Sequence, residues 1–271
     1  MRVLKAGIDP RRFFRRLSGA SARVLMLDYD GTLAPFTVRR DRALPFFNVW
    51  ALVTRIARAG RSRVALASGR SVRNLQALVG ADHGVELWGS HGAERLMPNG
   101  TVRAAPMPEE ATRFLREAEA WIAQRGWGPL LERKPFGLAV HGRGEDPMMF
   151  SAVRDTVQEG LGAAALEAAC DIVRFDGGIE LRPRAHQKGL VVETMAAEEG
   201  SGAVLAYLGD DLTDEDAFRA VAGRGLAVLV RDRERPTSAD LWIKPPGELL
   251  WFLDEWERAQ AAPAGAREAV P

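Results

Sequence analysis

The 271-residue chain has little of three things: cysteine, long apolar runs and net charge. Cys170 is its one cysteine, which excludes an intramolecular disulfide and favours a reducing compartment, so we expect a cytoplasmic protein. No run of 18 apolar residues occurs, and no apolar segment follows the charged N-terminal residues, so we expect neither a membrane span nor a signal peptide. Lys and Arg number 37 against 36 Asp and Glu, and a net charge of +1 gives no long-range attraction for nucleic acid or an anionic membrane. We therefore expect no nucleic-acid or membrane partner.

A local basic cluster departs from this even charge. Residues 11–16 read Arg-Arg-Phe-Phe-Arg-Arg, which fits either a contact with nucleic acid or membrane, or a short helix whose arginines face solvent. We favour the helix, because charged residues are mostly exposed.

The order of apolar and polar segments predicts an α/β fold. Short apolar stretches end in turn residues and are followed by helix-like patterns, and this strand–helix unit recurs along the chain. With 46% hydrophobic residues the chain is long enough to bury a sizeable core around a parallel sheet. The expected strands are 24–27, 63–67, 85–88, 204–208, 227–230 and 241–243, and the expected helices are 45–59, 72–79, 188–199, one from about 214 and one through 251–256.

In the middle of the chain the order changes, because each helix is followed by two strands in place of one. Helix 108–125 precedes a hairpin of 130–133 and 137–141, and helix 147–161 precedes a hairpin of 171–175 and 178–182. These tandem units predict a small α+β layer with an antiparallel sheet, inserted at 105–183 into a core made from 1–104 and 184–271. Residues 261–271 are rich in Ala, Gly and Pro and predict a frayed tail.

Polar side chains stand where several of the predicted strands end. Asp28 and Asp30 follow the apolar stretch 24–27, and Ser68 follows the next strand. A later strand is followed by Asp210, Asp211 and Asp214, and Lys188 opens a helix. An Asx-rich turn is the alternative for Asp28 and Asp30 taken alone. If the strands are parallel neighbours, all these side chains meet at one edge of the sheet, where open α/β sheets bind ligands.

Carboxylates gathered at one edge raise each other's pKa unless a cation joins them, so this cluster predicts a metal site. The donors are oxygen atoms without His or Cys, which favours Mg²⁺, an ion that takes one or two carboxylates together with phosphate oxygens. Residues 210–216 lack the glycine and the distal glutamate of an EF-hand loop, which excludes that calcium motif. Lys188 and Ser68 would then donate hydrogen bonds to a phosphate held at the metal.

The same residues carry a family resemblance. In order and spacing, four segments resemble the motifs of the haloacid dehalogenase superfamily of phosphatases: Asp28-Tyr29-Asp30-Gly31-Thr32-Leu33, Ser68-Gly69-Arg70, Lys188-Gly189 and the stretch 209–216. The resemblance implies a Rossmann-like parallel-sheet core of the haloacid dehalogenase type, and the insertion resembles the type C2 cap domain. Within the superfamily, residues 90–94, 138–143 and 178–183 are similar to trehalose-6-phosphate phosphatases, although Gly142 stands where that family often has an aromatic residue.

The resemblance implies a role for each core residue. Asp28 would attack phosphorus to give an aspartyl-phosphate, and Asp30 would protonate the leaving oxygen and then deprotonate water. Mg²⁺ would be bound by Asp28, the backbone carbonyl of Asp30, and Asp210, with either Asp211 or Asp214 behind these ligands. Ser68 and Lys188 would hold the phosphoryl oxygens.

Charged residues in and around the insertion would recognise the sugar, as the resemblance and their positions at hairpin ends suggest. The candidates are Glu94, Lys134, His141, Arg143, Glu180 and Arg182. Glu180 is favoured, because Gly177 and Gly178 near it allow close approach of the backbone. His91 fits a structural role as well as a substrate contact.

The resemblance thus predicts a monomeric Mg²⁺-dependent phosphatase for a small sugar phosphate, with trehalose 6-phosphate as the expected substrate. Enzymes with the same core and cap type are alternatives, namely phosphatases for sucrose 6-phosphate or glycosyl-3-phosphoglycerate, and phosphohexomutases. A non-catalytic regulatory module of the same fold is a further alternative. Asp28 and Asp30 argue against it, because such a module is expected to lack one of them.

Overall fold

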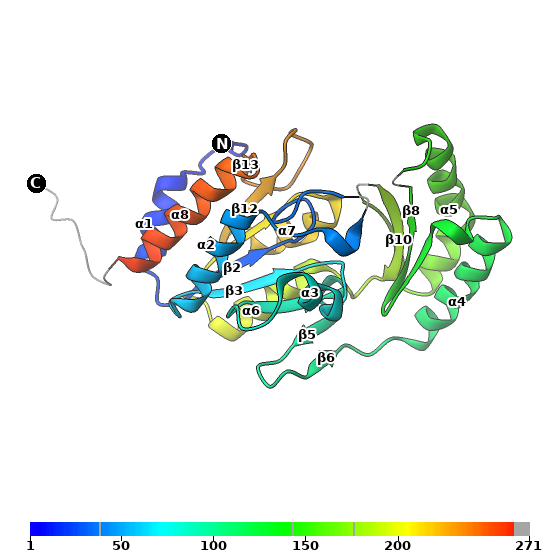
Figure 1. Ribbon diagram of the computed structural model, residues 1–271, viewed down its shortest axis with the longest axis horizontal. Helices are drawn as coiled ribbons and strands as arrows, with labels where there is room; N and C mark the ends of the chain where they lie inside the picture. The colour runs from blue at the N-terminus through cyan, green and yellow to red at the C-terminus, as the bar shows by residue number, and fades with distance from the viewer. Residues whose placement is uncertain (38, 143, 176, 263–271) are drawn as a thin grey trace, which may run out of the picture.

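The computed structural model describes residues 1–37, 39–142, 144–175 and 177–262, and it contains two β-sheets flanked by helices (Figure 1). The larger sheet has nine strands and the smaller has four. Of the tail predicted at 261–271, all but the first two residues lie outside the described residues.

The large sheet has the strand order β1-β13-β12-β11-β2-β3-β4-β5-β6. Its strands from β13 to β4 are parallel, and β1, β5 and β6 pair antiparallel at the two edges. Parallel strands are buried on both faces, which is why they read as continuous apolar runs. The strands are β1 Arg2–Val3, β2 Arg23–Leu27, β3 Arg63–Ala67, β4 Glu86–Gly89, β5 Glu94–Leu96, β6 Val102–Ala104, β11 Val204–Gly209, β12 Gly225–Val230 and β13 Leu241–Ile243.

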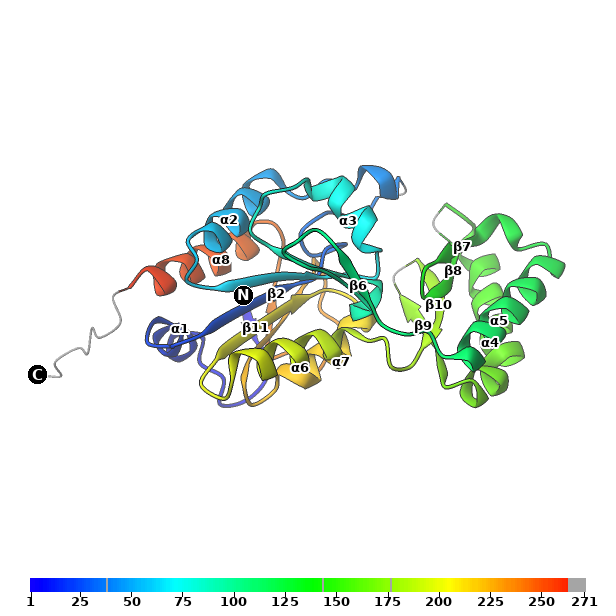
Figure 2. The same cartoon turned by 90° about the horizontal axis from the view of Figure 1, so that it is seen from below.

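Helices cover both faces of the large sheet (Figure 2). One face packs against α1 (Pro10–Ser18), α2 (Phe47–Arg58), α3 (Val72–Val79) and α8 (Gly247–Ala261). The other packs against α6 (Lys188–Glu199) and α7 (Glu215–Val221). The two apolar clusters between these layers form the core of this α/β unit and confirm the predicted fold class.

The small sheet is antiparallel, with the order β7-β8-β10-β9. Its strands are β7 Leu131–Lys134, β8 Gly137–His141, β9 Cys170–Phe175 and β10 Gly178–Pro183, and its helices are α4 Glu109–Gln124 and α5 Pro147–Glu167. Both helices lie on the outer side of this sheet, and its other face looks toward the large sheet (Figure 1). A separate apolar cluster joins α4 and α5 to the sheet, so the predicted antiparallel α+β layer is present.

Helix α5 corrects one prediction, because it continues to Glu167 where the sequence pattern placed its end at Leu161. Gly160 lies inside the helix, and a β-carbon there would come within 2.3 Å of the Trp121 ring. The glycine therefore serves the close approach of α4 and α5, and the alanines after it carry the helix on. In α2, which lies within the predicted helix 45–59, the first helical residue is the apolar Phe47, yet it is 85% exposed.

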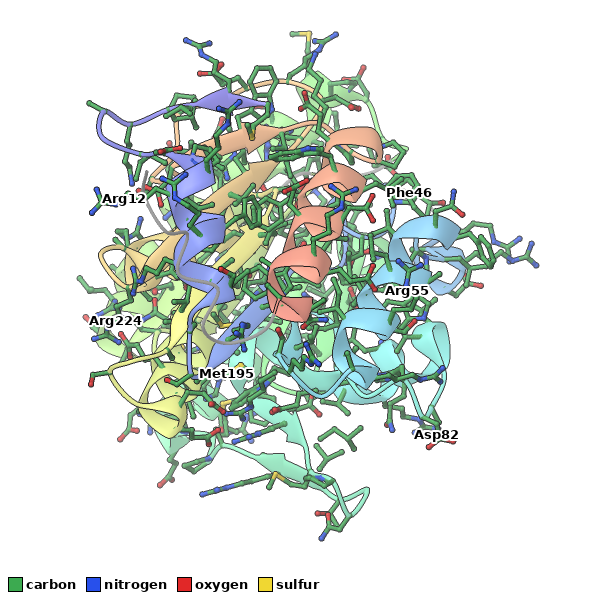
Figure 3. The ribbon with its side chains drawn as sticks, turned by 90° about the vertical axis from the view of Figure 1, so that its left-hand side faces the viewer. Arg12, Phe46, Arg55, Asp82, Met195 and Arg224 are labelled. Carbon is green, nitrogen blue, oxygen red and sulfur yellow. The ribbon has the colours of Figure 1, made fainter. Side chains whose placement is uncertain are left out.

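The basic cluster at the N-terminus forms the solvated helix that the sequence favoured. Asp9 caps α1 by accepting a hydrogen bond from the N–H of Arg11, and Phe13, Phe14 and Leu17 are buried. The arginines of α1 are exposed, and Arg12 points outward at the end of the molecule that lies far from the small sheet (Figure 3). Among the described residues, no helix has the length and apolar composition that a membrane crossing requires.

Candidate active site

Three neighbouring strands of the large sheet end at one cavity. β2 lies between β11 and β3, all three are parallel, and a polar residue follows soon after each: Asp28, Asp210 and Ser68 respectively. These three side chains are buried and line a cavity of about 70 Å³ together with Asp30 and Lys188. The structure therefore brings together the strand-end residues that the sequence placed at one edge.

Lys188 joins two of the buried carboxylates. Its Nζ donates to Asp28 Oδ1 at 2.6 Å and to Asp214 Oδ1 at 2.7 Å. Burial lowers the pKa of Lys188 by less than Asp214 and Asp28 raise it, so the side chain remains an ammonium. Burial raises the pKa of Asp28 to about 7 against the opposing effect of Lys188, and Asp214 adds to the rise. One ammonium thus serves a cluster of three aspartates.

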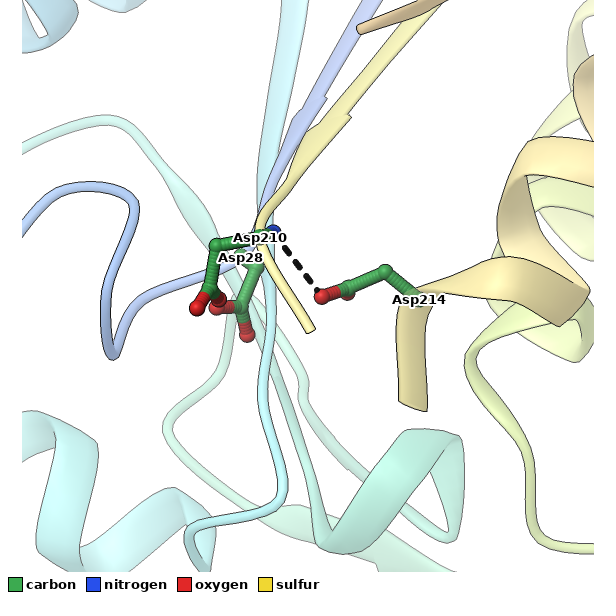
Figure 4. Close-up of side chains that lie close together, drawn as sticks. All are labelled: Asp28, Asp210 and Asp214. Carbon is green, nitrogen blue, oxygen red and sulfur yellow. Dashed lines mark hydrogen bonds between the residues drawn. The ribbon is translucent and has the colours of Figure 1, made fainter. Parts of the chain in front are cut away.

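Asp214 uses both of its oxygens for contacts within the protein. Oδ1 accepts from Lys188 and, at 2.7 Å, from the Tyr207 hydroxyl, and Oδ2 accepts from the backbone N–H groups of Asp210 at 3.1 Å and Asp211 at 3.0 Å (Figure 4). Burial would raise the pKa of Asp214, but Lys188, Tyr207 and the backbone donors lower it, so the group is ionised. Asp214 therefore fixes the loop after β11.

Asp210 is the opposite case. Both of its carboxylate oxygens are buried and have no hydrogen-bond partner among the described residues, and burial together with Asp28 raises its pKa well above the ordinary value. Donor oxygens of Asp28, Asp210 and Asp214 lie within 4.8 Å of one another. Unpaired buried carboxylate oxygens beside a second carboxylate fit a hard cation that would satisfy them. A β-carbon at Gly31, whose φ is +88°, would sit 2.3 Å from Asp210 Oδ2, so this close approach requires glycine.

The remaining members of the predicted metal set have other side-chain contacts. The Asp30 carboxylate is held by Arg70, whose Nε and Nη2 each donate to one of its oxygens at 2.6 Å. Asp211 Oδ1 accepts from the N–H of Leu212 and caps the short helix there. Asp30 and Asp211 both line the cavity, and Arg70, which the sequence placed in a motif without a role, lines it with them.

The small sheet supplies the other wall of the cavity. Lys134 from β7, His141 from β8, Phe175 from β9 and Glu180 from β10 line it. Lys134 Nζ donates to Glu180 Oε2 at 2.8 Å, and His91 Nε2, from the large-sheet side, lies 3.2 Å from the same oxygen. Glu180 therefore contacts a residue on the large-sheet side, His91, as well as Lys134 on its own sheet.

The charges around Glu180 determine whether the His91 imidazole is protonated and which of its ring nitrogens carries the hydrogen. Burial would raise the pKa of Glu180, but Lys134, His91 and Arg182 hold it well below the usual range. Burial, with Arg182 adding to it, lowers the pKa of His91 to about 3, so the imidazole is neutral. An ionised carboxylate only accepts hydrogen bonds, so Nε2 of His91 carries the hydrogen that points to Glu180.

Two of the predicted sugar-binding residues, Glu94 and Arg182, do not line the cavity. Glu94 Oε2 accepts from the Ser90 hydroxyl at 2.7 Å and from the N–H of Val72 at 3.2 Å, at the start of α3. Arg182 is buried outside the cavity lining. Arg143 lies outside the described residues. A hairpin-end position indicates that a residue is near the site without indicating which way its side chain turns.

Gly142, the departure from the family pattern, also has a structural explanation. A β-carbon at this position would lie 2.1 Å from ring atoms of Phe150, which is buried in α5. Phe150 therefore occupies the space next to Gly142 that a side chain there would need.

Several residues that line the cavity have no role in the prediction made from the sequence. Phe36 and Phe175 are aromatic residues from the two sides of the cavity, and Thr213 follows the loop of Asp210. No motif at the level of the sequence marks the two phenylalanines. Thr213 stands inside the motif 209–216, where a role could have been assigned.

Comparison with known proteins identifies relatives of the whole arrangement. Residues 26–243 match the family model described as trehalose-phosphatase. The chain is 34% identical over 261 residues to a trehalose-phosphate phosphatase of Mycolicibacterium paratuberculosis, covering 87% of this chain and 63% of that protein. It is 28% identical to trehalose-phosphate phosphatase B of Arabidopsis thaliana, covering 87% of this chain and 67% of that protein. The chain thus spans 60–63% of the length of its first mycobacterial relatives.

Solved structures share the fold. The C-terminal domain of a C. albicans trehalose-6-phosphate phosphatase superposes with a TM-score of 0.79 at 19% identity, covering 95% of this chain and 99% of that one. A haloacid dehalogenase-like hydrolase from B. subtilis superposes with a TM-score of 0.63 at 12% identity, covering 85% of this chain and 98% of that one. At such identities the likeness concerns the fold alone, and it is the fold of haloacid dehalogenase-like hydrolases.

Proposed function

The chain belongs to the trehalose-phosphatase family, and from that premise we propose that it hydrolyses trehalose 6-phosphate to trehalose and phosphate with the help of Mg²⁺. One observation carries the proposal: a single cavity joins Asp28 and Asp210 at the strand ends and Lys188 at the start of α6 to Lys134 and Glu180 on the small sheet. The first group suits a phosphoryl group and a cation, and the second suits sugar hydroxyls.

In the proposed reaction, a carboxylate oxygen of Asp28 attacks phosphorus as the bond from phosphorus to the sugar oxygen breaks. Asp30 gives its proton to that oxygen, and trehalose leaves. Asp30 then takes a proton from water, whose oxygen attacks phosphorus and releases phosphate and free Asp28. Lys188 and Ser68 hold the phosphoryl oxygens. Arg70 holds both Asp30 oxygens before substrate binds, so this contact must open for Asp30 to carry the proton that it donates.

Mg²⁺ would be held by Asp28, the carbonyl of Asp30, and Asp210, whose unpaired oxygens are the feature that fits a cation. When bound, it supplies positive charge that offsets the repulsion between the Asp28 carboxylate and an anionic phosphate. Lys188 contributes to the same offset through its hydrogen bond to Asp28 Oδ1.

Residues 105–183 would act as a cap over the core made from 1–104 and 184–271. The cavity of about 70 Å³ is too small for a disaccharide phosphate, since pockets for ligands of that size are typically about 300–1,000 Å³. The cap would therefore open to admit substrate and close over it, which would exclude water. Opening would break the contact between His91 and Glu180. We also propose that the protein acts as a monomer. It would act in the cytoplasm, because its lone Cys170 favours a reducing compartment.

The substrate assignment is tested by phosphate release from a panel of sugar phosphates. We expect kcat/KM for trehalose 6-phosphate to exceed that for glucose 6-phosphate by about 100-fold or more, because polar groups on the cap would be left unpaired by the smaller sugar. Sucrose 6-phosphate and glucosyl-3-phosphoglycerate test the related enzymes. Equal rates with trehalose 6-phosphate and glucose 6-phosphate would remove the substrate assignment, and no release from any member would favour a non-catalytic module.

The matched variant for this panel is Glu180→Gln, which keeps the shape of the side chain and removes its charge. We expect it to raise KM for trehalose 6-phosphate by about 10-fold or more, as for a lost hydrogen bond to a charged group. The loss for p-nitrophenyl phosphate, which has no sugar, should be clearly smaller. Equal losses for both compounds would contradict a sugar-binding role for Glu180.

Metal removal gives a further prediction, with a defined pH dependence. EDTA should stop phosphate release and Mg²⁺ should restore it. Because the pKa of Asp28 is raised to about 7 in the metal-free protein, Mg²⁺ must displace a proton below that pH. Calorimetry at pH 6, 7 and 8 should therefore show Mg²⁺ affinity that weakens toward pH 6, by up to about 10-fold per pH unit below the pKa. Full activity in EDTA, or tighter binding at pH 6, would contradict the site.

A further inference from the structure

Side chains of the loop from β12 to β13 donate hydrogen bonds to the backbone of the residues that follow β11. Arg235 Nε donates to the carbonyl oxygen of Asp210 at 3.2 Å, and its Nη2 donates to the carbonyl oxygen of Asp211 at 2.6 Å. Arg231 Nη1 donates to the same Asp210 carbonyl at 3.2 Å. Two guanidinium groups are therefore directed at the peptide of the residue whose carboxylate oxygens lack partners.

Arg235 is itself held in place, which makes its contacts specific. Its Nη1 pairs with Glu215 Oε1 and also donates to the carbonyl oxygen of Pro236 at 2.9 Å. Glu215 in turn accepts from the Thr237 hydroxyl at 2.8 Å and from the N–H of Ser238 at 2.7 Å. The side chains of Arg235 and Glu215 are each 14% exposed, so this network is mostly shielded from water.

The other side of the same backbone is held by Asp214. Its Oδ2 accepts from the N–H groups of Asp210 and Asp211, and the Arg235 fork binds their carbonyls. Both polar groups of each residue's main chain are thus fixed by side chains, while the Asp210 carboxylate accepts no hydrogen bond from the part of the chain that the structure describes. A ligand whose backbone is fixed in advance loses little freedom when a cation binds it.

We propose that Arg235 is a positioning residue for cation binding: it fixes the Asp210 backbone so that the carboxylate faces the cation site. The inference rests on the proposed cation and adds a residue that none of the four motifs contains. Electrostatic repulsion alone predicts the opposite change in affinity. A guanidinium near a cation repels it, so removal of the guanidinium would tighten cation binding. The sign of the change in Mg²⁺ affinity therefore separates the two effects.

The experiment is calorimetric titration of the full chain with Mg²⁺, with no substrate present. Arg235→Gln removes the charge and the fork, and Arg235→Lys keeps the charge and removes the fork. Arg233→Gln is the matched control, since Arg233 lies in the same loop, is exposed and contacts no described residue through a hydrogen bond or ion pair. We expect both Arg235 variants to bind Mg²⁺ about 10–100-fold more weakly, as for other partners that orient metal ligands, and Arg233→Gln to stay within about twofold.

The other outcomes distinguish the positioning role of Arg235 from the cation site itself. Unchanged or tighter Mg²⁺ binding in the Arg235 variants, with the unaltered chain binding normally, would overturn only the positioning role. No Mg²⁺ binding by the unaltered chain would overturn the proposed cation site and this inference with it. Circular dichroism and thermal unfolding monitor the fold, and loss of fold in both Arg235 variants would overturn the inference by showing that the contacts serve the fold.

Discussion

The Asp28→Asn variant is expected to lose phosphate release from trehalose 6-phosphate by on the order of 10⁵-fold or more, with the fold intact. An amide is nearly the same size as a carboxylate but is a far weaker nucleophile, so the attack on phosphorus fails while packing is kept. In a protease that acts through a covalent intermediate, loss of the nucleophile lowers kcat by about 2 × 10⁶-fold. The measurement is the initial rate at saturating substrate and Mg²⁺, beside the circular dichroism spectrum.

The same variant should be more stable than the unaltered chain in the absence of metal. Burial raises the pKa of Asp28 to about 7, whereas in an unfolded chain it is about 3.9, so the ionised group destabilises the fold above pH 7. That penalty disappears below about pH 4, where the group is protonated in both states. The gain in melting temperature on replacing Asp28 should therefore grow as the pH rises from 4 to 8. Retained turnover would remove Asp28 as the nucleophile, and a gain largest at acid pH would contradict the electrostatic cause.

The sequence was sufficient to predict the edge of the sheet at which the site lies. Asp28 and Asp210 follow uninterrupted apolar strands, and parallel strands bring their carboxyl ends together whatever the details of the loops. This regularity comes from the backbone, so it can be read from hydrophobic pattern alone. The antiparallel small sheet was also predictable from the hydrophobic pattern, because that pattern contains two helix–hairpin repeats.

The direction of each side chain could not be predicted in the same way. Asp214 lies in the carboxylate cluster, but the sequence does not show that its oxygens accept from Lys188, Tyr207 and two backbone N–H groups. Arg70 stands 40 residues from its partner Asp30, and spacing along the chain does not reveal such a pair. Glu94 turns toward the start of α3, where an N–H group competes for its carboxylate. Such choices depend on local hydrogen-bond competition in the folded chain.

The Lys188→Met variant tests the other half of the site's charge balance and is expected to affect stability as well as activity. The Lys188 side chain is 3% exposed, and its ammonium contacts both Asp28 and Asp214. Its loss therefore leaves these buried carboxyl groups without a positive partner. Breaking a buried ion pair by removing one partner typically costs about 3–5 kcal/mol. Urea unfolding without metal should show a loss of that size, and phosphate release should fall by about 10²–10³-fold, as for a lost preorganised donor.

Three comparisons show whether this loss comes from the buried charges. Lys5→Met removes a lysine whose side chain is 43% exposed beside Asp240, and it should lower the free energy of unfolding by about 1 kcal/mol or less. The double variant Lys188→Met, Asp214→Asn removes one charge of each sign, so it should regain part of the stability lost in Lys188→Met. Mg²⁺ should also stabilise Lys188→Met more than the unaltered chain, because the cation replaces the missing positive charge. If Lys188→Met were as stable as Lys5→Met without metal, the Asp214 carboxylate would not depend on Lys188 for its charge, and the charge balance of this site would be wrong.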